Sequence, residues 1–225
     1  MDKPRTYWDT FTTSYQMGHQ KHRDYLLDLL KEKNVVSLLD VGCGTGPIYE
    51  IIRESNKVIP GDGNRIASRH EWRWPFKYKG TDYSPAMIEV CKQSYPEGDW
   101  QVEDARHLDE KDNSWECVLL MHSLDHLDDY KAAISEAARV SGKYVCIVLW
   151  RPIMDSDENN LNDRNMYGKV EGEEPWQDTH LQEYSRKKLE EAFKESKLKI
   201  VCTVDGEVIN SASNSCNSLF LLEKI

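Results

Sequence analysis

The segment Leu38-Leu39-Asp40-Val41-Gly42-Cys43-Gly44-Thr45-Gly46 decides the fold class of this chain. It completes an apolar run that starts at Val35 and is rich in Val and Leu, which predicts a short buried strand. Three glycines follow within five positions, and Pro47 then opens a helix. Glycines let a turn bend tightly and approach a ligand with no Cβ in the way. The segment therefore predicts a strand, a turn suited to ligand binding, and a helix in succession.

Strand-type and helix-type segments alternate along the rest of the chain. Ser84 and Pro85 form a helix start, with Ser as the N-cap and Pro at the first helical position. Helical patterns cover 26–30, 85–91, 130–140 and the stretch after Ser185, and strand patterns cover 116–121, 144–150, 200–204 and 219–222. Continuously apolar strands that alternate with helices indicate a parallel sheet covered on both faces. We therefore expect an α/β, doubly wound fold whose last two strands pair antiparallel.

Length and composition exclude several other classes of protein. A chain of 225 residues fits one domain, 1–225, and 39% hydrophobic with 30% charged residues exclude disorder, coiled coil and collagen. No apolar run approaches the roughly 18–20 residues of a membrane span, and the N-terminus lacks the apolar region of a secretion signal. The six cysteines have no C-x-x-C or zinc spacing, so we expect no metal site. These features predict a cytoplasmic protein.

The net charge of −10 disfavours nucleic acid as a partner, because phosphate backbones repel an acidic protein. One segment departs from this balance. Residues 53–79 carry seven basic and three acidic side chains, a local charge of +4. Two stretches, 54–76 and 151–183, are also longer than ordinary connections. We interpret them as insertions, before the second strand and after the fifth, and the second as a possible substrate lid.

The glycine turn resembles motif I of the class I S-adenosylmethionine-dependent methyltransferases, Asp-x-Gly-x-Gly-x-Gly after a first strand. Three further stretches, 80–88, 102–105 and 115–127, resemble the same family in the expected order. A dinucleotide-binding G-x-G-x-x-G is less similar, because Asp40 precedes the glycines and the third glycine stands at another offset. The resemblance implies a mostly parallel seven-stranded sheet with an antiparallel last strand, the Rossmann-like methyltransferase fold. It also implies S-adenosyl-L-methionine as the cofactor.

The resemblance assigns roles to acidic residues at the strand ends. It implies that Asp82 accepts hydrogen bonds from both ribose hydroxyls, and that Asp104 accepts one from the adenine amino group beside the Ala105 N–H. The implied cofactor-binding set is Tyr15, Asp40, Gly42, Cys43, Gly44, Gly46, Asp82, Tyr83, Met87, Asp104, Ala105 and Met121. Asp82 lies 42 positions after Asp40, about twenty more than is usual in the family. Asp62 is the alternative, but Tyr83-Ser84-Pro85 favours Asp82.

Candidate substrate-side residues follow the fourth strand, lie near the N-terminus, and precede the last long helix. His122 and His126 are candidate catalytic residues, since a general base helps when the nucleophile is a hydroxyl or an ammonium. We favour His122, because a histidine at 126 more often packs the loop. The remaining candidates are Tyr7, Trp8, Trp176 and His180; for each of these, packing is an equally good interpretation.

The sequence thus predicts a methyltransferase that acts on an oxygen or nitrogen of a small molecule. Two alternatives stay open. One is a tRNA or protein methyltransferase that uses the basic 53–79 segment, and the other is a non-catalytic binding subunit with the same fold. The expected partner is a small-molecule substrate, with nucleic acid unlikely and no membrane; the sequence does not indicate an oligomeric state.

Overall fold

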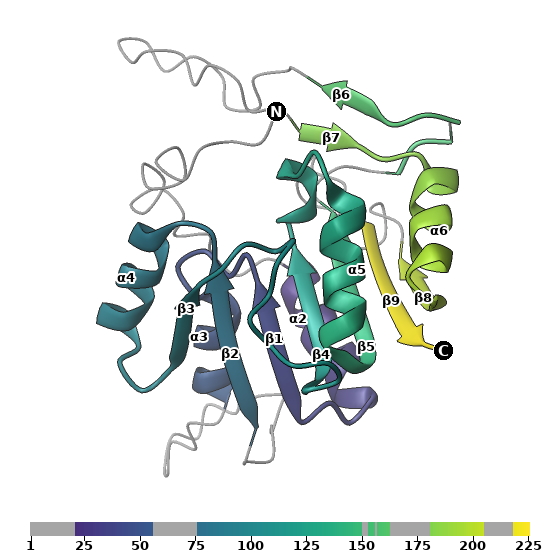
Figure 1. Cartoon of the computed structure of the whole chain (residues 1–225). Coiled ribbons are helices and arrows are strands. Elements are labelled where there is room, and N and C mark those ends of the chain that lie inside the picture. The colour runs from purple at the N-terminus through teal and green to yellow at the C-terminus, as the bar shows by residue number, and fades with distance from the viewer. Residues whose placement is uncertain (1–20, 56–75, 150–152, 156, 163–180, 205–217) are drawn as a thin grey trace, which may run out of the picture.

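The computed structural model describes residues 21–55, 76–149, 153–155, 157–162, 181–204 and 218–225 (Figure 1). A seven-stranded sheet in the order β3-β2-β1-β4-β5-β9-β8 forms its centre. The strands are β1 Ser37–Val41, β2 Lys77–Asp82, β3 Asp99–Val102, β4 Trp115–Met121, β5 Ser141–Leu149, β8 Leu198–Val204 and β9 Ser218–Lys224. The first five are parallel, and β9 is antiparallel to both β5 and β8. The expected mostly parallel sheet with an antiparallel last strand is confirmed.

Helices cover both faces of the sheet (Figure 1). The helices are α2 Lys21–Glu32, α3 Pro47–Ser55, α4 Pro85–Ser94, α5 Tyr130–Val140 and α6 Arg186–Glu195. One apolar cluster joins the sheet to α2, α3 and α4, and a second joins it to α5 and α6. Strands β1, β4, β5 and β9 are largely buried along their length, because helices or neighbouring segments cover both faces of the sheet there, whereas β8 at the edge is only partly buried.

Side-chain caps fix where the helices begin. The Ser84 hydroxyl accepts a hydrogen bond from the N–H of Met87 at 3.1 Å, with Pro85 at the first helical position. Ser185 caps α6 in the same way. Both starts were predicted from the sequence, because Ser at an N-cap satisfies a backbone donor that the helix itself leaves open.

Aromatic packing fixes β2 against its neighbours. A Cβ added to Gly80 would lie 2.4 Å from the Trp100 ring, so only glycine fits beneath this indole. Tyr49 and Tyr78 pack around the same ring, with centroids 5.1 and 5.7 Å from that of Trp100. This cluster lies under the turn that follows β1.

The structure describes parts of the two stretches that were interpreted as insertions, 54–76 and 151–183. Helix α3 extends into the first of these stretches, to Ser55, and the last residue of that stretch, Phe76, is buried in the core. In the 151–183 stretch, two short described segments pair as antiparallel strands, β6 Asn160–Asn162 and β7 Leu181–Glu183. Next to β7, the Tyr184 hydroxyl donates to the carbonyl of Leu124 at 2.7 Å, which anchors this segment to the loop after β4.

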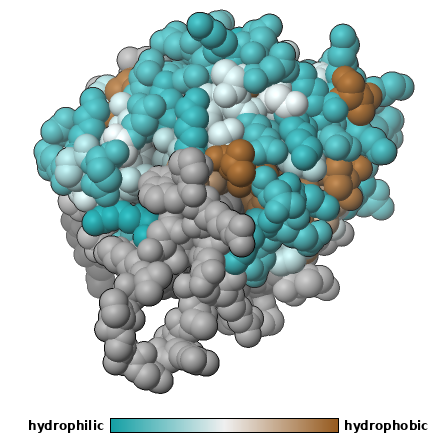
Figure 2. All heavy atoms as spheres, turned by 90° about the horizontal axis from the view of Figure 1, so that it is seen from below, coloured by the Kyte–Doolittle hydropathy of each residue, from teal (hydrophilic) through white to brown (hydrophobic). Residues whose placement is uncertain are grey.

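The surface opposite the carboxyl ends of the parallel strands is mainly hydrophilic where it is described (Figure 2). The exposed large hydrophobic side chains of the described residues are Tyr25, Val36, Val201 and Ile225. Apolar side chains scattered in this way are ordinary on a protein surface. Within the described ranges, no helix combines the length and the apolar character that crossing a membrane requires.

Candidate functional site

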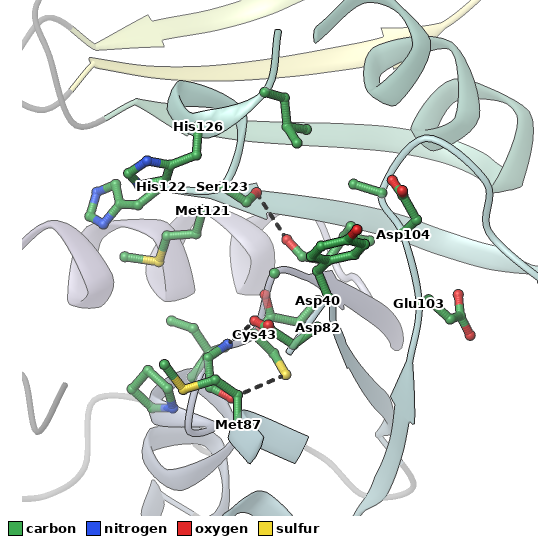
Figure 3. Close-up of a pocket in the computed structure, with 18 of the residues that line it drawn as sticks. Asp40, Cys43, Asp82, Met87, Glu103, Asp104, Met121, His122, Ser123 and His126 are labelled. Atoms are coloured by element: carbon green, nitrogen blue, oxygen red, sulfur yellow. Dashed lines mark hydrogen bonds between the residues drawn. The ribbon is translucent and has the colours of Figure 1, made fainter. Parts of the chain in front are cut away.

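The carboxyl ends of β1, β2, β3 and β4 surround a cavity of about 1070 Å³, its open mouth included (Figure 3). This is where open α/β sheets bind their ligands. Most of the residues predicted for the site line this cavity. They are Asp40, Gly42, Cys43, Gly44, Asp82, Tyr83, Met87, Asp104, Ala105, Met121, His122 and His126.

The other predicted residues are placed differently or lie outside the described ranges. Gly46 does not line the cavity; a Cβ there would lie 3.0 Å from Trp100 and 3.2 Å from Tyr95. Its positive φ of 81° makes the turn, so its role is to shape the backbone rather than to face a ligand. The remaining predicted residues, Tyr7, Trp8, Tyr15, Trp176 and His180, lie outside the described residues, as does Asp62.

The glycine turn is attached to the end of β2 through backbone groups. The N–H groups of Gly42 and Cys43 donate to the Thr81 carbonyl at 2.8 and 2.9 Å. The N–H of Gly44 donates to Oδ2 of Asp82, and the N–H of Ser84 donates to its Oδ1, both at 2.9 Å. The Asp82 carboxylate therefore has a fixed orientation at the strand end. This is the position expected for the second-strand acid.

Asp40 is a buried carboxyl group at the base of the cavity. Its side chain accepts a hydrogen bond of 2.7 Å from the Tyr78 hydroxyl. Burial raises the pKa of Asp40 to about 7; the charge of Asp82 adds to this rise, whereas the Tyr78 bond and the charge of Arg23 oppose it. Arg23, from α2, is itself 3% exposed and lines the cavity. The base of the cavity thus contains two carboxyl groups and one guanidinium.

Asp104 is a third acidic residue of the cavity and follows β3 (Figure 3). Arg106 holds both of its carboxylate oxygens. The backbone N–H and the Nε of Arg106 donate to Oδ1 at 2.9 Å, and Nη2 donates to Oδ2 at 2.7 Å. The neighbouring Glu103 turns its carboxylate away from the cavity, toward Lys79 at 3.1 Å. Asp104 is therefore the acidic side chain that faces the cavity at this strand end.

Residues 103–114 are fixed to the body of the fold from two sides. Lys79 of β2 donates to Glu103 and Glu110, and its side chain is buried. From α5, Arg139 donates to the carbonyls of Leu108 and Glu110 at 2.9 and 2.8 Å. These bonds hold the loop that begins with Asp104.

The histidines lie across the cavity from Asp104, both on the same side (Figure 3). His122 is 6% exposed and has a φ of +56°, a left-handed conformation that is uncommon outside glycine. Its N–H donates to the carbonyl of Val148 at 2.8 Å, which continues the pairing of β4 with β5. Strained backbone of this kind concentrates at functional sites. The cavity thus has a carboxylate end and an imidazole end.

Several cavity-lining residues were missed by the sequence reasoning. They are Arg23, Val41, Pro47, Ile48, Glu103, Arg106, Ser123 and Leu127. Most are direct neighbours of predicted residues and could have been found by widening each motif by one or two positions. Arg23 is different, because it lies on a helix before the first strand and belongs to no motif.

The described part of the basic 53–79 segment does not form a free cationic surface. Lys79 is buried between Glu103 and Glu110, and Arg53 pairs with Glu97 at 3.1 Å. Lys77 is exposed, and its Nζ lies 3.7 Å from the centroid of the Trp115 ring. The local charge of +4 therefore overstates the number of basic side chains in this segment that could contact a phosphate backbone. Its other basic residues, at 57, 65, 69 and 73, lie outside the described ranges.

Sequence comparisons agree with this geometry. The family profile described as "Methyltransferase domain" matches residues 15–203. A demethylmenaquinone methyltransferase of Bacillus licheniformis is 28% identical over 142 residues, which are 60% of this chain and 54% of that protein. A ubiquinone/menaquinone biosynthesis C-methyltransferase of Desulfotalea psychrophila is 27% identical over 146 residues, 62% and 52% of the two chains. The chain spans about half the length of these curated relatives.

A solved structure supports the fold. Magnesium protoporphyrin IX methyltransferase from Synechocystis, determined with bound SAH, matches with a TM-score of 0.65 and 14% identity over 98% of each chain. Together with the strand order, this identifies the sheet as a Rossmann-like methyltransferase fold.

Proposed function

The chain belongs to the methyltransferase-domain family, and we propose that it transfers the methyl group of S-adenosylmethionine to an oxygen or nitrogen of a small-molecule acceptor. The observation that carries this proposal is the cavity, where the glycine turn, Asp82, Asp104 and His122 meet at adjoining strand ends. A fold alone does not imply a function, so the argument depends on these residues.

The residues present fit this cofactor. Gly42 and Gly44 have φ values of +78° and +56°, so the turn presents backbone without side chains to the ligand's amino-acid part. Arg23 and Asp40 offer charges of the two signs that an amino acid's carboxylate and ammonium require. Asp82 offers a fixed carboxylate to ribose hydroxyls.

Catalysis in this site consists mainly of alignment. The cofactor supplies the electrophilic methyl group, so the protein must position the acceptor in line with it and exclude water. His122 lies at the imidazole end, where it can take the proton that a hydroxyl loses as it attacks, or that an ammonium must lose before its nitrogen can attack. The acceptor atom then forms its bond to the methyl carbon as the carbon–sulfur bond breaks. We further propose that the 151–183 insertion covers this end, since its strand β7 lies against the loop that carries His126, and Tyr184, directly after β7, donates a hydrogen bond to Leu124 of that loop.

A carbon acceptor is a second candidate, because one relative is named a C-methyltransferase. An imidazole that deprotonates an enol or phenol creates a nucleophile with two reactive positions, oxygen and carbon. The same base therefore serves either outcome, and the placement of the acceptor decides between them. Methylation of tRNA or protein has less support, because Lys79 and Arg53 are engaged in ion pairs.

Titration calorimetry with S-adenosylmethionine and S-adenosylhomocysteine tests the proposal directly. We expect both to bind. A screen of hydroxyl, amine and quinol acceptors, with tRNA and peptide pools alongside, then identifies the methylated product by mass spectrometry. If neither compound binds, the chain is a non-catalytic subunit with this fold. If only tRNA or peptide is methylated, the small-molecule proposal is wrong.

A further inference from the structure

Arg106 donates three hydrogen bonds to the Asp104 carboxylate and so occupies most of its acceptor positions. A carboxylate offers about four acceptor positions, two on each oxygen. Arg106 fills two on Oδ1, through its backbone N–H and Nε, and one on Oδ2 through Nη2. Within the described part of the chain, Asp104 has no other side-chain hydrogen bond. One acceptor position on Oδ2 is therefore left for a donor from a ligand.

The pair is also accessible from the cavity and held in one geometry. The side chains of Asp104 and Arg106 are 21% and 23% exposed, and both residues line the cavity. A two-pronged guanidinium–carboxylate pair fixes the plane of both groups. Asp104 is thus prevented from rotating, and the Nε and Nη2 donors of Arg106 are directed at Asp104 rather than at a ligand.

We propose that Arg106 determines base specificity, so that the site accepts a purine with a 6-amino group and refuses one with a 6-oxo group. The inference rests on the proposed function, because it places the purine of the cofactor at the end of β3. A 6-amino group donates to the open position on Oδ2. A 6-oxo oxygen meets that same position as a second acceptor, and the fixed carboxylate cannot turn away from it.

Calorimetry with S-adenosylhomocysteine and its 6-oxo counterpart, S-inosylhomocysteine, measures this discrimination. We expect the wild type to prefer the adenine compound by roughly a hundredfold or more, since the 6-oxo oxygen would face the Asp104 carboxylate with no donor between them. Arg106→Ala frees the carboxylate to rotate and should reduce the ratio by about tenfold. Arg106→Lys keeps the positive charge but lacks the two-pronged guanidinium, so its affinity ratio should lie between those of the wild type and Arg106→Ala.

Asp104→Ala gives a second readout that a purely structural role of Arg106 would not produce. This variant releases the guanidinium, whose donors then suit a 6-oxo oxygen, so the preference should shift toward S-inosylhomocysteine. Adding Arg106→Ala to Asp104→Ala should abolish that shift. Lys131→Ala is the matched control. It removes an exposed ion pair of 2.8 Å between Lys131 of α5 and Glu195 of α6, so it should leave the ratio of the two affinities unchanged.

The outcomes distinguish a failure of the proposed function from a failure of the proposed role of Arg106. If the wild type binds neither compound, the proposed function fails and the inference with it. If the wild type binds S-adenosylhomocysteine but Arg106→Ala and Arg106→Lys keep the wild-type ratio, the inference alone is overturned. An absent shift in Asp104→Ala, with thermal melting showing a folded protein, also overturns it.

Discussion

The Tyr78 hydroxyl donates a hydrogen bond to the buried carboxyl group of Asp40 across 2.7 Å, beneath the glycine turn. This bond favours the ionised form of Asp40 but does not offset its burial, and the pKa stays at about 7. Asp40 therefore titrates near neutral pH, at the base of the cavity.

The raised pKa of Asp40 predicts that its contribution to stability falls as pH rises. The folded protein keeps this proton up to pH 7, whereas the unfolded chain loses it near the ordinary value of 3.8. Between these values the folded state binds more protons, so raising the pH lowers the free energy of unfolding, by at most about 4.5 kcal/mol at about 1.4 kcal/mol per pKa unit. Urea unfolding at pH 5 and pH 8 should show the part of this loss that falls between pH 5 and 7, about 3 kcal/mol at about 1.4 kcal/mol per pKa unit, for the wild type relative to Asp40→Asn. An equal change in the free energy of unfolding between the two pH values in both proteins would contradict this prediction.

Cofactor binding is expected to release a proton below pH 7. A ligand ammonium beside Asp40 favours its ionised form and so lowers its pKa, which makes binding tighter as pH rises toward 7. Calorimetry of S-adenosylhomocysteine binding at pH 6, in buffers of different ionisation enthalpy, counts the protons released. Asp40→Asn should bind without that release. Release by both proteins alike would assign the proton to another group.

Gly42→Ala is expected to weaken both cofactor binding and folding. The residue has a φ of +78°, and an added Cβ would lie 2.5 Å from the Cβ of Ser123. Combining it with Ser123→Gly removes the clash but not the backbone strain, so thermal stability should recover in part. Thermal melts and S-adenosylhomocysteine titrations of the single and double variants test this. A single variant with unchanged stability would mean that the turn tolerates a side chain.

Asp82→Ala should weaken S-adenosylhomocysteine binding by roughly ten- to a hundredfold, because losing a charge-assisted pair of hydrogen bonds costs about 1.5–3 kcal/mol. Asp62→Ala is the matched control, and calorimetry should show it binding as the wild type does. Since Asp82 also orders the Gly44 and Ser84 N–H groups, circular dichroism must show an intact fold. The reverse pattern would assign the ribose to Asp62.

His122→Asn is the sharpest test of base catalysis. Asparagine tolerates the left-handed backbone that His122 adopts, so this variant removes the imidazole with little added strain. We expect turnover to fall by about 10²–10⁴, with cofactor affinity nearly unchanged. The wild-type rate should rise with pH through the range in which imidazole titrates, and the variant should lose that rise. His126→Asn should keep more activity; full activity of His122→Asn would exclude it as the base.

Local signals explain how much of the fold could be predicted. The bounds of α5, Tyr130–Val140, agree with the prediction, because its Ala-rich apolar stripe is continuous in sequence. The caps Ser84 and Ser185 were equally visible, since capping depends on a few adjacent residues. Strand β5 begins at Ser141, earlier than expected, because pairing with β4 rather than apolar content sets its start.

Features that depend on contacts distant in sequence could not be predicted. Lys79 belongs to a basic segment, yet Glu103 and Glu110 bury it, and neither lies near it in sequence. Arg23 reaches the cavity only because α2 packs on the sheet beside β1. The left-handed φ of His122 is likewise set by its pairing with Val148.

The place of β9 has a consequence for how the polypeptide assembles as it is synthesised. β9 lies between β5 and β8, and it is the last of the seven strands to be made. The strands that surround the cavity can pair as soon as they emerge, whereas β8 has no neighbour in the sheet until Ser218–Lys224 arrive. Until then Phe193 of α6 lacks its ring contact with Phe220, 5.2 Å away between centroids. During that interval the nascent chain therefore has the strands around the cavity already paired beside an open sheet edge, and an unpaired edge of this kind favours aggregation.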